Sequence, residues 1–429
     1  MITGFSGLRA GLLGEKLSHS FSPQLHSMLA DYSYELFEVP ADRLADFMRS
    51  DRFDALNVTI PYKKAVMPYL DRVSPEAQRI GAVNTIVRGR DGLCGYNTDY
   101  HGFLYTLRRL GVPTGGKALV LGSGGASATA VAALSDAGTD KVVVISRSGK
   151  DNYENISDHA DAELIVNATP VGMYPSPDAS PLSLKGFPRL RGVIDLIYNP
   201  NMTELMFEAR ELGIPASGGL PMLVSQGVKA CEIFTGGSGS GDRREQTDET
   251  RTAEALIARI KTSNLNIVLI GMPGSGKTVC GKAVAAILGR EFVDIDELIE
   301  RECGKSITRI FAEDGQEYFR ETESRLTALA AMRSGTVIAT GGGVVTRLQN
   351  RIALQRNSAV IRLMRDTEKL ATNGRPLSLA RGTETLLKER GPLYRSFAHG
   401  SVTVTEGNVE ATAREIIAKM KELCENGVI

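Results

Sequence analysis

A strand-like run of apolar residues that leads straight into a glycine-rich turn limits the fold of this chain more than any other feature. NIVLI is followed by GMPGSGKT and then by the helix-like VCGKAVAAIL, and the turn satisfies G-x-x-x-x-G-K-[ST] from Gly271 to Thr278. In this order, backbone N–H groups surround phosphate oxygens, Lys277 reaches the outer phosphates, and the Thr278 hydroxyl holds Mg²⁺. An ordinary glycine-rich turn is the alternative. The pattern favours a nucleotide-binding α/β domain.

Two aspartates follow the next predicted strand of this domain. Asp294 and Asp296 alternate in FVDID, so they lie on one face of an extended segment. Two carboxylates beside a nucleotide suit a magnesium ion and a hydroxyl group that must lose its proton. The alternative is a helix N-cap, because ELIERECG follows and aspartate is favoured there. For Asp296 the two roles can hold together.

Three arginines and a triple glycine come later in the same block. Arg320 lies in EYFRETE, Arg375 in NGRPL and Arg395 in GPLYRS. Residues 341–343 of ATGGG let the backbone approach a ligand closely. Each arginine taken alone is best explained as a solvated surface residue. Their order after the phosphate-binding turn is what favours a binding site.

A second glycine turn lies in the first half of the chain, between a buried-strand pattern and a helix of small residues. KALVL leads into GSGGAS, which keeps Gly122, Gly124 and Gly125 of the dinucleotide-binding pattern. Ser127 stands in place of the last glycine, and a structural turn is the alternative. The position between strand and helix favours dinucleotide binding.

The end of the next strand, KVVVISRSG, bears on the choice of cofactor. An acidic residue there would bind the ribose hydroxyls of NAD, but this chain has Ser146, Arg147 and Ser148. A cation between two hydroxyls suits the 2′-phosphate of NADP, so the sequence predicts NADP. A surface turn with a solvated arginine is the alternative.

Polar residues follow several strand-like segments between residues 9 and 110, where α/β folds place their ligands. Each could merely cap a helix or close a turn, but six together favour a site. They are Ser20, Ser22, Thr59, Lys63, Asn84 and Asp99. A protonated lysine such as Lys63 can give its proton to a carbonyl oxygen whose carbon receives hydride. A nearby Asp99 would keep that lysine charged.

A polar stretch separates the two blocks. GGSGSGDRREQTDETR, residues 236–251, cannot bury enough apolar surface to offset the entropy of ordering, so we expect a linker there. TAEALIARI is then expected to form a short amphipathic helix. With 429 residues, the chain is long enough for about three domains of ~150 residues.

Composition excludes several classes of partner. Lysine plus arginine equals aspartate plus glutamate at 50 each, so no overall field attracts nucleic acid or an acidic membrane, and we expect small-molecule partners. Five scattered cysteines lack the spacing of zinc sites or of a disulfide framework, which suits a reducing cytoplasm. The first residues lack a signal-peptide pattern, and no stretch approaches the ~18 apolar residues of a membrane span. We therefore expect a cytoplasmic protein.

The block from residue 264 to 424 resembles shikimate kinase on GMPGSGKT, FVDID, FRETES, ATGGG, GRPL and PLYR, in that family's order. The resemblance implies that Lys277 and Asp296 are catalytic and that Thr278 and Asp294 bind Mg²⁺. The residues that it implies for shikimate are Asp296, Arg320, Gly342 and Arg395. Both arginines would face the carboxylate of shikimate, and Asp296 would face the attacking hydroxyl. The residues that it implies for ATP are Gly274, Ser275, Gly276, Lys277, Thr278, Val279 and, in a lid, Arg375.

The block from Arg9 to Gly236 resembles shikimate dehydrogenase on GLLGEKLSHSFSPQLH, NVTIPYKK, GAVNT, GYNTD, GSGGAS, NATPVGM, DLIYNP and GGLPMLVSQ. The resemblance implies that Lys63 and Asp99 form the catalytic pair. The substrate-binding residues that it implies are Ser20, Ser22, Thr59, Lys63, Asn84, Asp99, Tyr198 and Gln226. The NADP-binding residues that it implies are Gly122, Ser123, Gly124, Gly125, Ala126, Ser146, Arg147, Leu196 and Gly219.

The two resemblances together predict a bifunctional enzyme built from α/β folds. We expect a substrate-binding domain in residues 1–105 and 213–236, a Rossmann-like NADP-binding domain in 106–212, a linker in 237–262 and a P-loop kinase domain in 263–429. The first block would reduce 3-dehydroshikimate to shikimate with NADPH, and the second would phosphorylate shikimate with ATP and Mg²⁺. The alternatives are a quinate dehydrogenase that uses NAD, fused to the same kinase, and a regulatory sensor of these folds without catalysis. The oligomeric state stays open.

Overall fold

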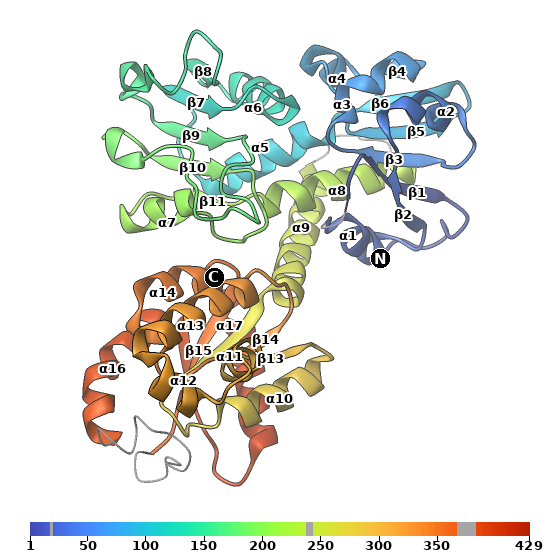
Figure 1. Ribbon diagram of the computed structural model, residues 1–429. Coiled ribbons are helices and arrows are strands. Elements are labelled where there is room, and N and C mark those ends of the chain that lie inside the picture. The colour runs from blue at the N-terminus through green and yellow to red at the C-terminus, as the bar shows by residue number, and fades with distance from the viewer. Residues whose placement is uncertain (18–19, 237–242, 367–382) are drawn as a thin grey trace. The chain divides into compact units, whose positions relative to one another are not determined.

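The computed structural model describes residues 1–429 except 18–19, 237–242 and 367–382 (Figure 1). The chain divides into two compact units. Unit 1 comprises Met1–Tyr198 and Thr203–Ile257, and unit 2 comprises Asn199–Met202 and Ala258–Ile429. Within the described residues, three sheets carry the strands of these units, and no helix combines the length and apolar character needed to cross a membrane. The predicted α/β fold class is confirmed.

The first sheet of unit 1 is mixed and has six strands in the order β2-β1-β3-β5-β6-β4. Its central strand β3 is buried at all four positions, as expected for a strand covered on both faces. The strands are β1 (Arg9–Gly14), β2 (Ser33–Glu38), β3 (Ala55–Val58), β4 (Arg72–Val73), β5 (Thr85–Gly89) and β6 (Gly92–Tyr96). The helices beside them are α1 (Ser22–Leu29), α2 (Leu44–Arg49), α3 (Tyr62–Ala65) and α4 (Pro75–Ile80).

The second sheet of unit 1 is parallel throughout and has the order β11-β10-β9-β7-β8. Parallel strands end at the same edge, so the turns after β7 and β8, which hold GSGGAS and SRSG, lie next to each other. The elements are β7 (Lys117–Leu121), α6 (Gly125–Asp136), β8 (Lys141–Ile145), β9 (Leu164–Asn167), β10 (Gly192–Asp195), α7 (Glu204–Glu211) and β11 (Ala216–Ser217).

Two long helices of unit 1, α5 (Thr98–Leu110) and α8 (Leu220–Phe234), pack against each other (Figure 1). Gly102 makes their close approach possible, because a Cβ at this position would lie 2.5 Å from the Met222 carbonyl oxygen. The contact brings the start of α5, with Asp99, near the middle of α8, with Gln226.

Unit 2 contains one parallel sheet in the order β13-β14-β12-β15-β16. The strand before the phosphate-binding turn, β12, is buried at every position between β14 and β15, which explains its unbroken apolar pattern. The strands are β12 (Asn266–Ile270), β13 (Phe292–Asp294), β14 (Val337–Ala339), β15 (Ser358–Met364) and β16 (Gly400–Thr403). The helices are α10 (Lys277–Leu288), α11 (Ile295–Cys303), α12 (Ile307–Glu313), α13 (Gly315–Ala331), α14 (Leu348–Gln355), α16 (Thr383–Phe397) and α17 (Val409–Glu425).

Residues 243–251 were expected to lack regular structure, but α9 begins at Arg243 and continues to Asn264. Tertiary contacts within unit 1 hold this helix: in its unexpected first part, the Glu249 carboxylate lies 3.6 Å from Lys229 Nζ and 3.6 Å from His101 Nε2. The Glu254 carboxylate accepts hydrogen bonds from the Tyr105 hydroxyl at 2.6 Å and from Arg109 Nε at 2.8 Å. Composition measures only the apolar surface of the segment itself, whereas this helix gains stability from groups that lie about 150 residues earlier in the chain.

The division of unit 1 at residues 105 and 212 stays a prediction.

All five cysteines are free thiols, as their spacing predicted.

Candidate active sites

The two residues predicted to form the first catalytic pair meet in unit 1. Lys63 Nζ, on the short helix α3, donates to Asp99 Oδ2 at 2.6 Å, with Asp99 in the first turn of α5. Their side chains are 19% and 12% exposed, so the pair is sheltered but can still be reached. An ammonium group has three N–H donors. Among the described residues, Asp99 takes up one of them, which leaves the others for a substrate oxygen.

The lysine also lies beside the second glycine turn. A Cβ at Gly125, the first residue of α6, would lie 3.8 Å from Lys63 Cδ. The predicted proton donor therefore lies next to the predicted cofactor-binding turn.

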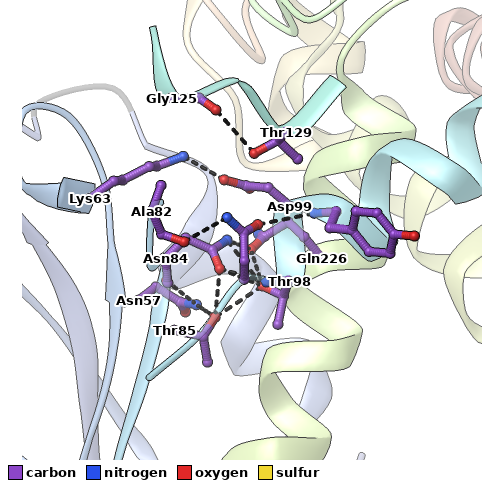
Figure 2. A network of polar contacts seen from close by, with 12 residues as sticks. Asn57, Lys63, Ala82, Asn84, Thr85, Thr98, Asp99, Gly125, Thr129 and Gln226 are labelled. Atoms are coloured by element: carbon purple, nitrogen blue, oxygen red, sulfur yellow. Dashed lines mark hydrogen bonds and ion pairs between the residues drawn. The ribbon is translucent and has the colours of Figure 1, made fainter. Parts of the chain in front are cut away.

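Asn84 and Gln226, both predicted to bind substrate, meet through Thr98 (Figure 2). Asn84 Nδ2 donates to Thr98 Oγ1 at 3.1 Å, and Thr98 Oγ1 donates to Gln226 Oε1 at 3.3 Å. Figure 2 shows this group directly below the Lys63–Asp99 pair. All three side chains are buried, so their polar atoms are held by each other and not by bulk water.

Ser20, Ser22, Thr59 and Tyr198 lie at the ends of elements in the same unit. Ser22 begins α1 and is buried, and its N–H donates to Ser20 Oγ at 3.2 Å. Thr59 directly follows β3 and is half-buried. Burial raises the pKa of the Tyr198 hydroxyl, and the Tyr198 ring contacts Phe21 with 5.2 Å between centroids. Sequence reasoning did not single out Phe21, which joins the loop before α1 to the loop after β10.

A buried carboxylate holds the loop that carries Leu196 and Tyr198. Asp195 Oδ1 accepts from the Ile197 N–H at 3.1 Å and from Asn167 Nδ2 at 3.0 Å, while Oδ2 accepts from the Thr203 hydroxyl at 2.7 Å. Burial raises the pKa of Asp195 to about 6. The loop after β10 is thus fixed at both ends.

The turn between β7 and α6 fits a dinucleotide. Gly122 has φ of +108°, and a Cβ there would lie 3.1 Å from the Ala168 carbonyl oxygen, so only glycine suits this position. At Gly124 a Cβ would meet nothing within 4 Å, and no side chain caps the first turn of α6. Open space in front of the N–H groups at a helix start suits a phosphate.

The remaining residues predicted for NADP surround this turn. Ser146 and Arg147 follow β8, and Arg147 is exposed. A Cβ at Gly219 would collide with the Leu196 carbonyl oxygen, so these two positions are in direct backbone contact. The donors and the space fit the predicted cofactor.

The phosphate-binding turn of unit 2 is folded around its lysine. Lys277 Nζ is buried and donates to the carbonyl oxygens of Gly271 at 3.0 Å and Met272 at 2.9 Å. Gly274 and Gly276 have φ of +84° and +91°. Ser275 Oγ is buried without a hydrogen-bond partner in the described part of the chain. A buried unpaired hydroxyl in such a turn suits a phosphate oxygen.

Thr278 and Asp294 converge as the predicted magnesium ligands should. Thr278 Oγ1 donates to Asp294 Oδ2 at 2.7 Å, which places two oxygen ligands together at the end of β13. Asp294 Oδ1 accepts from the Asp296 N–H at 3.0 Å, so the helix-capping role belongs to Asp294. The Asp296 side chain is left to face the glycines after β14.

The triple glycine after β14 borders a compact charged group. A Cβ at Gly341 would lie 2.7 Å from Asp296 Oδ1 and 2.9 Å from Glu323 Oε1. A Cβ at Gly343 would collide with the Arg320 guanidinium. Charged side chains therefore lie directly against the backbone at Gly341 and Gly343.

Arg320 and Glu323 form a buried ion pair on α13. Arg320 Nη1 donates to Glu323 Oε2 at 2.5 Å, and the side chains are 7% and 1% exposed. Burial raises the pKa of Glu323, and the neighbouring arginines oppose that rise. Glu323 Oε1 has no hydrogen-bond partner among the described residues. Glu323 was not predicted, although it lies in the FRETES motif and is one helical turn from Arg320.

Arg390 and the predicted Arg395 of unit 2 differ in burial. Arg395 on α16 is exposed, whereas Arg390 is buried and donates from Nη1 to the Gly342 carbonyl oxygen at 3.0 Å. Tyr394 Oη donates to the same oxygen at 2.6 Å. Positions 390 and 394 are four residues apart and share a helix face, while 395 is turned away by a further 100° or so. Arg390 is therefore the arginine that lies against Gly342, and the role of Arg395 stays a prediction.

The remaining predicted residues of unit 2 are Val279 and Arg375. The Val279 side chain is exposed, in the first turn of α10. Arg375 lies outside the described residues.

Comparison with known families divides the chain in the same way. Residues 12–86 match the family model for the shikimate dehydrogenase substrate binding domain, and residues 273–421 match the model for shikimate kinase. The shikimate dehydrogenase (NADP(+)) of Clostridium beijerinckii is 40% identical over 245 residues, which is 52% of this chain and 90% of the relative. The corresponding protein of Thermus thermophilus is 39% identical, over 53% of this chain and 93% of the relative.

Solved structures similar to unit 1 belong to the same group. A chorismate mutase/shikimate 5-dehydrogenase fusion protein from Clostridium acetobutylicum has a TM-score of 0.52 at 36% identity, and covers 58% of this chain and 97% of its own. A shikimate 5-dehydrogenase from Thermus thermophilus in complex with NADP(H) and shikimate has a TM-score of 0.51 at 37% identity, and covers 57% of this chain and 99% of its own.

Proposed function

Because this chain belongs to the shikimate dehydrogenase family and its residues 273–421 match shikimate kinase, we infer that it catalyses two consecutive reactions. Unit 1 reduces 3-dehydroshikimate to shikimate with NADPH. Unit 2 phosphorylates shikimate with ATP and Mg²⁺ to give shikimate 3-phosphate. One observation carries this conclusion: the chain matches two enzyme families. The first family produces shikimate, and the second uses shikimate as its phosphate acceptor.

Lys63 supplies the proton in the reduction. When bound, NADPH supplies the hydride that reaches the carbonyl carbon. The carbonyl oxygen then takes a proton from the Lys63 ammonium, which Asp99 holds in place at 2.6 Å. A general acid in this position contributes about 10²–10⁴-fold to the rate. In the reverse direction the lysine amine takes the proton back.

The remaining polar residues of unit 1 orient the two ligands. Asn84 and Gln226 offer amide groups on one side of the Lys63–Asp99 pair. We assign the ring hydroxyls and the carboxylate of the substrate to these amides together with Ser20, Ser22, Thr59 and Tyr198. The open N–H groups at the start of α6 would face the pyrophosphate of NADP, and Arg147 would face its 2′-phosphate.

Unit 2 activates a hydroxyl between two charged groups. Lys277, Thr278 and Asp294 would hold the phosphates of ATP and their Mg²⁺, which neutralises the charge that builds up on the transferred phosphate. Asp296 would accept the proton of the attacking hydroxyl. The unpartnered Glu323 Oε1 is positioned to accept a hydrogen bond from a second ring hydroxyl.

Arg320 and Arg390 are the cations that we assign to the shikimate carboxylate. Both are buried and lie against the backbone of residues 342–343, whereas Arg395 is exposed. Charge-assisted contacts of this kind stabilise a bound carboxylate by about 1.5–3 kcal/mol each.

The full chain, given 3-dehydroshikimate, NADPH, ATP and Mg²⁺, should form shikimate 3-phosphate. Lys63→Ala should abolish NADPH oxidation and leave phosphorylation of added shikimate intact. Lys277→Ala should do the reverse, so each variant is the control for the other within one polypeptide. Retained turnover in either variant would contradict the corresponding assignment. Equal rates with NADH and NADPH would contradict the role of Arg147.

A further inference from the structure

A row of buried hydroxyl and amide groups lies behind the proposed shikimate-binding residues of unit 1. Figure 2 shows its centre, where Thr85 lies below Asn84 and Thr98 and beside Asn57. The row begins at Ser22, which hydrogen-bonds the half-buried Tyr34, and Tyr34 Oη donates to Asn57 Oδ1 at 2.8 Å. Sequence reasoning gave no role to Asn57 or Thr85.

Thr85 is the point at which the row reaches the substrate-binding amides. It is fully buried at the start of β5, directly opposite Asn57 of β3 in the sheet. Thr85 Oγ1 accepts from Asn57 Nδ2 at 3.3 Å and donates to Asn84 Oδ1 at 3.1 Å. It also lies 2.9 Å from Thr98 Oγ1. The Thr85 hydroxyl therefore contacts Asn84 itself and also Thr98, which hydrogen-bonds Asn84.

These contacts leave only one orientation for the Asn84 amide. The Thr98 backbone N–H can only donate, and it lies 2.6 Å from Asn84, so the atom facing it is the carbonyl oxygen Oδ1. The Thr85 hydroxyl donates to this same oxygen. Rotating the amide by 180° would place its NH₂ group against the Thr98 backbone N–H, which can only donate, and would remove the carbonyl oxygen that accepts from the Thr85 hydroxyl. The Nδ2 side therefore faces Thr98 and Gln226, the second of which is also assigned to the substrate.

We propose that Thr85 is a positioning residue that fixes the Asn84 amide so that its N–H donors, and not its carbonyl oxygen, face an oxygen atom of the substrate. The proposal rests on the dehydrogenase function of unit 1. Thr85 acts through Asn84 and touches neither the substrate nor NADPH.

Thr85→Val keeps the shape of the side chain and removes the hydroxyl. Without that donor the amide of Asn84 is less strictly oriented, so KM for 3-dehydroshikimate should rise about tenfold, while KM for NADPH and kinase turnover stay unchanged. Thr85→Ser restores the hydroxyl and should return KM to within about threefold of the original value. Combined with Asn84→Ala, Thr85→Val should add little, because the residue that it positions is absent.

Thr106→Val is the matched control. Thr106 is also fully buried in unit 1 and donates to the Gly102 carbonyl oxygen within α5, away from the row. It should leave KM for 3-dehydroshikimate unchanged. An unchanged KM in Thr85→Val, an equal rise in Thr106→Val, or no rescue by Thr85→Ser would overturn the proposal.

Two further measurements keep the test decisive. NADPH binding shows whether unit 1 of Thr85→Val is folded. If it is not, Asn84→Asp decides, because aspartate keeps both acceptor contacts but loses the N–H donors, so its KM should rise at least about tenfold. An original KM in Asn84→Asp would overturn the proposal. No dehydrogenase turnover in the unaltered chain would instead count against the proposed function.

Discussion

The two units each contain a short, sheltered pair of a cation and a carboxylate, and the pairs differ in what their cations can do. Lys63 and Asp99 are 2.6 Å apart, and Arg320 and Glu323 are 2.5 Å apart. The first pair is 19% and 12% exposed, and the second is 7% and 1% exposed. Lysine can release a proton under mild conditions, whereas the guanidinium of arginine stays charged.

In the proposed function, the same kind of contact takes part in proton transfer in unit 1 and in substrate binding in unit 2. A proton donor must be reached by the atom that it protonates, which explains the greater exposure of the lysine pair. A fixed cation for a carboxylate benefits from deeper burial, because removal of water strengthens the attraction. Glu323 then balances the Arg320 charge before the substrate arrives.

Lys63→Arg is expected to have the largest effect of the changes that test the difference between the two pairs. It keeps the positive charge beside Asp99 but removes a proton that can be transferred, so kcat for reduction should fall about 10²–10⁴-fold. The measurement is NADPH oxidation in the full chain at saturating substrate, with kinase turnover as the internal control. A kcat within about threefold of the original would show that charge alone suffices and would end the distinction between the pairs.

Arg390→Ala and Arg395→Ala test whether a buried arginine contributes more to shikimate binding in unit 2 than an exposed one. Arg390 is buried beside Gly342, so its removal should raise KM for shikimate about 10–100-fold, which corresponds to one charge-assisted contact. Arg395 is exposed on the same helix, and its removal should change KM less than about twofold. Coupled-assay kinetics with shikimate as the varied substrate measure both. The opposite ranking would restore Arg395 as the carboxylate-binding residue.

This pair of arginines also shows where sequence reasoning stops. The glycine turns could be predicted because the requirement for glycine is local: φ of +108° at Gly122 is set by the next few residues. The phase of α16, which buries Arg390 and exposes Arg395, is set by packing against residues of the sheet far away in the sequence. RGPLYR contains both arginines and gives no sign of which one faces inward.

The same limit applies to the polar groups of unit 1. Lys63, Asn84 and Asp99 could be found because each ends a strand-like segment or begins a helix. The role of Thr85 depends on its being opposite Asn57 in an antiparallel pair, and strand register is not written in either segment alone. The start of α9 was missed for a similar reason, because its stabilising partners lie on α5.

The pair on α9 gives the weakest and most exposed case in the comparison. Arg109 and Glu254 are 2.8 Å apart, but their side chains are 42% and 44% exposed. Solvent screens such a pair, so Glu254→Gln should cost unit 1 about 0.5–1 kcal/mol, or about 1–4 °C in its thermal midpoint. Glu410→Gln on α17 is the control, since Glu410 pairs with Arg414 in unit 2, where both side chains are still more exposed, and the change should leave the dehydrogenase transition unchanged. Because α9 begins in unit 1, the loss should appear in heat inactivation of NADPH oxidation and not in kinase turnover. A much larger shift would mean that α9 supports α5, and with it Asp99, by more than one exposed contact. No shift at all would mean that this ion pair does not explain why residues 243–257 are helical.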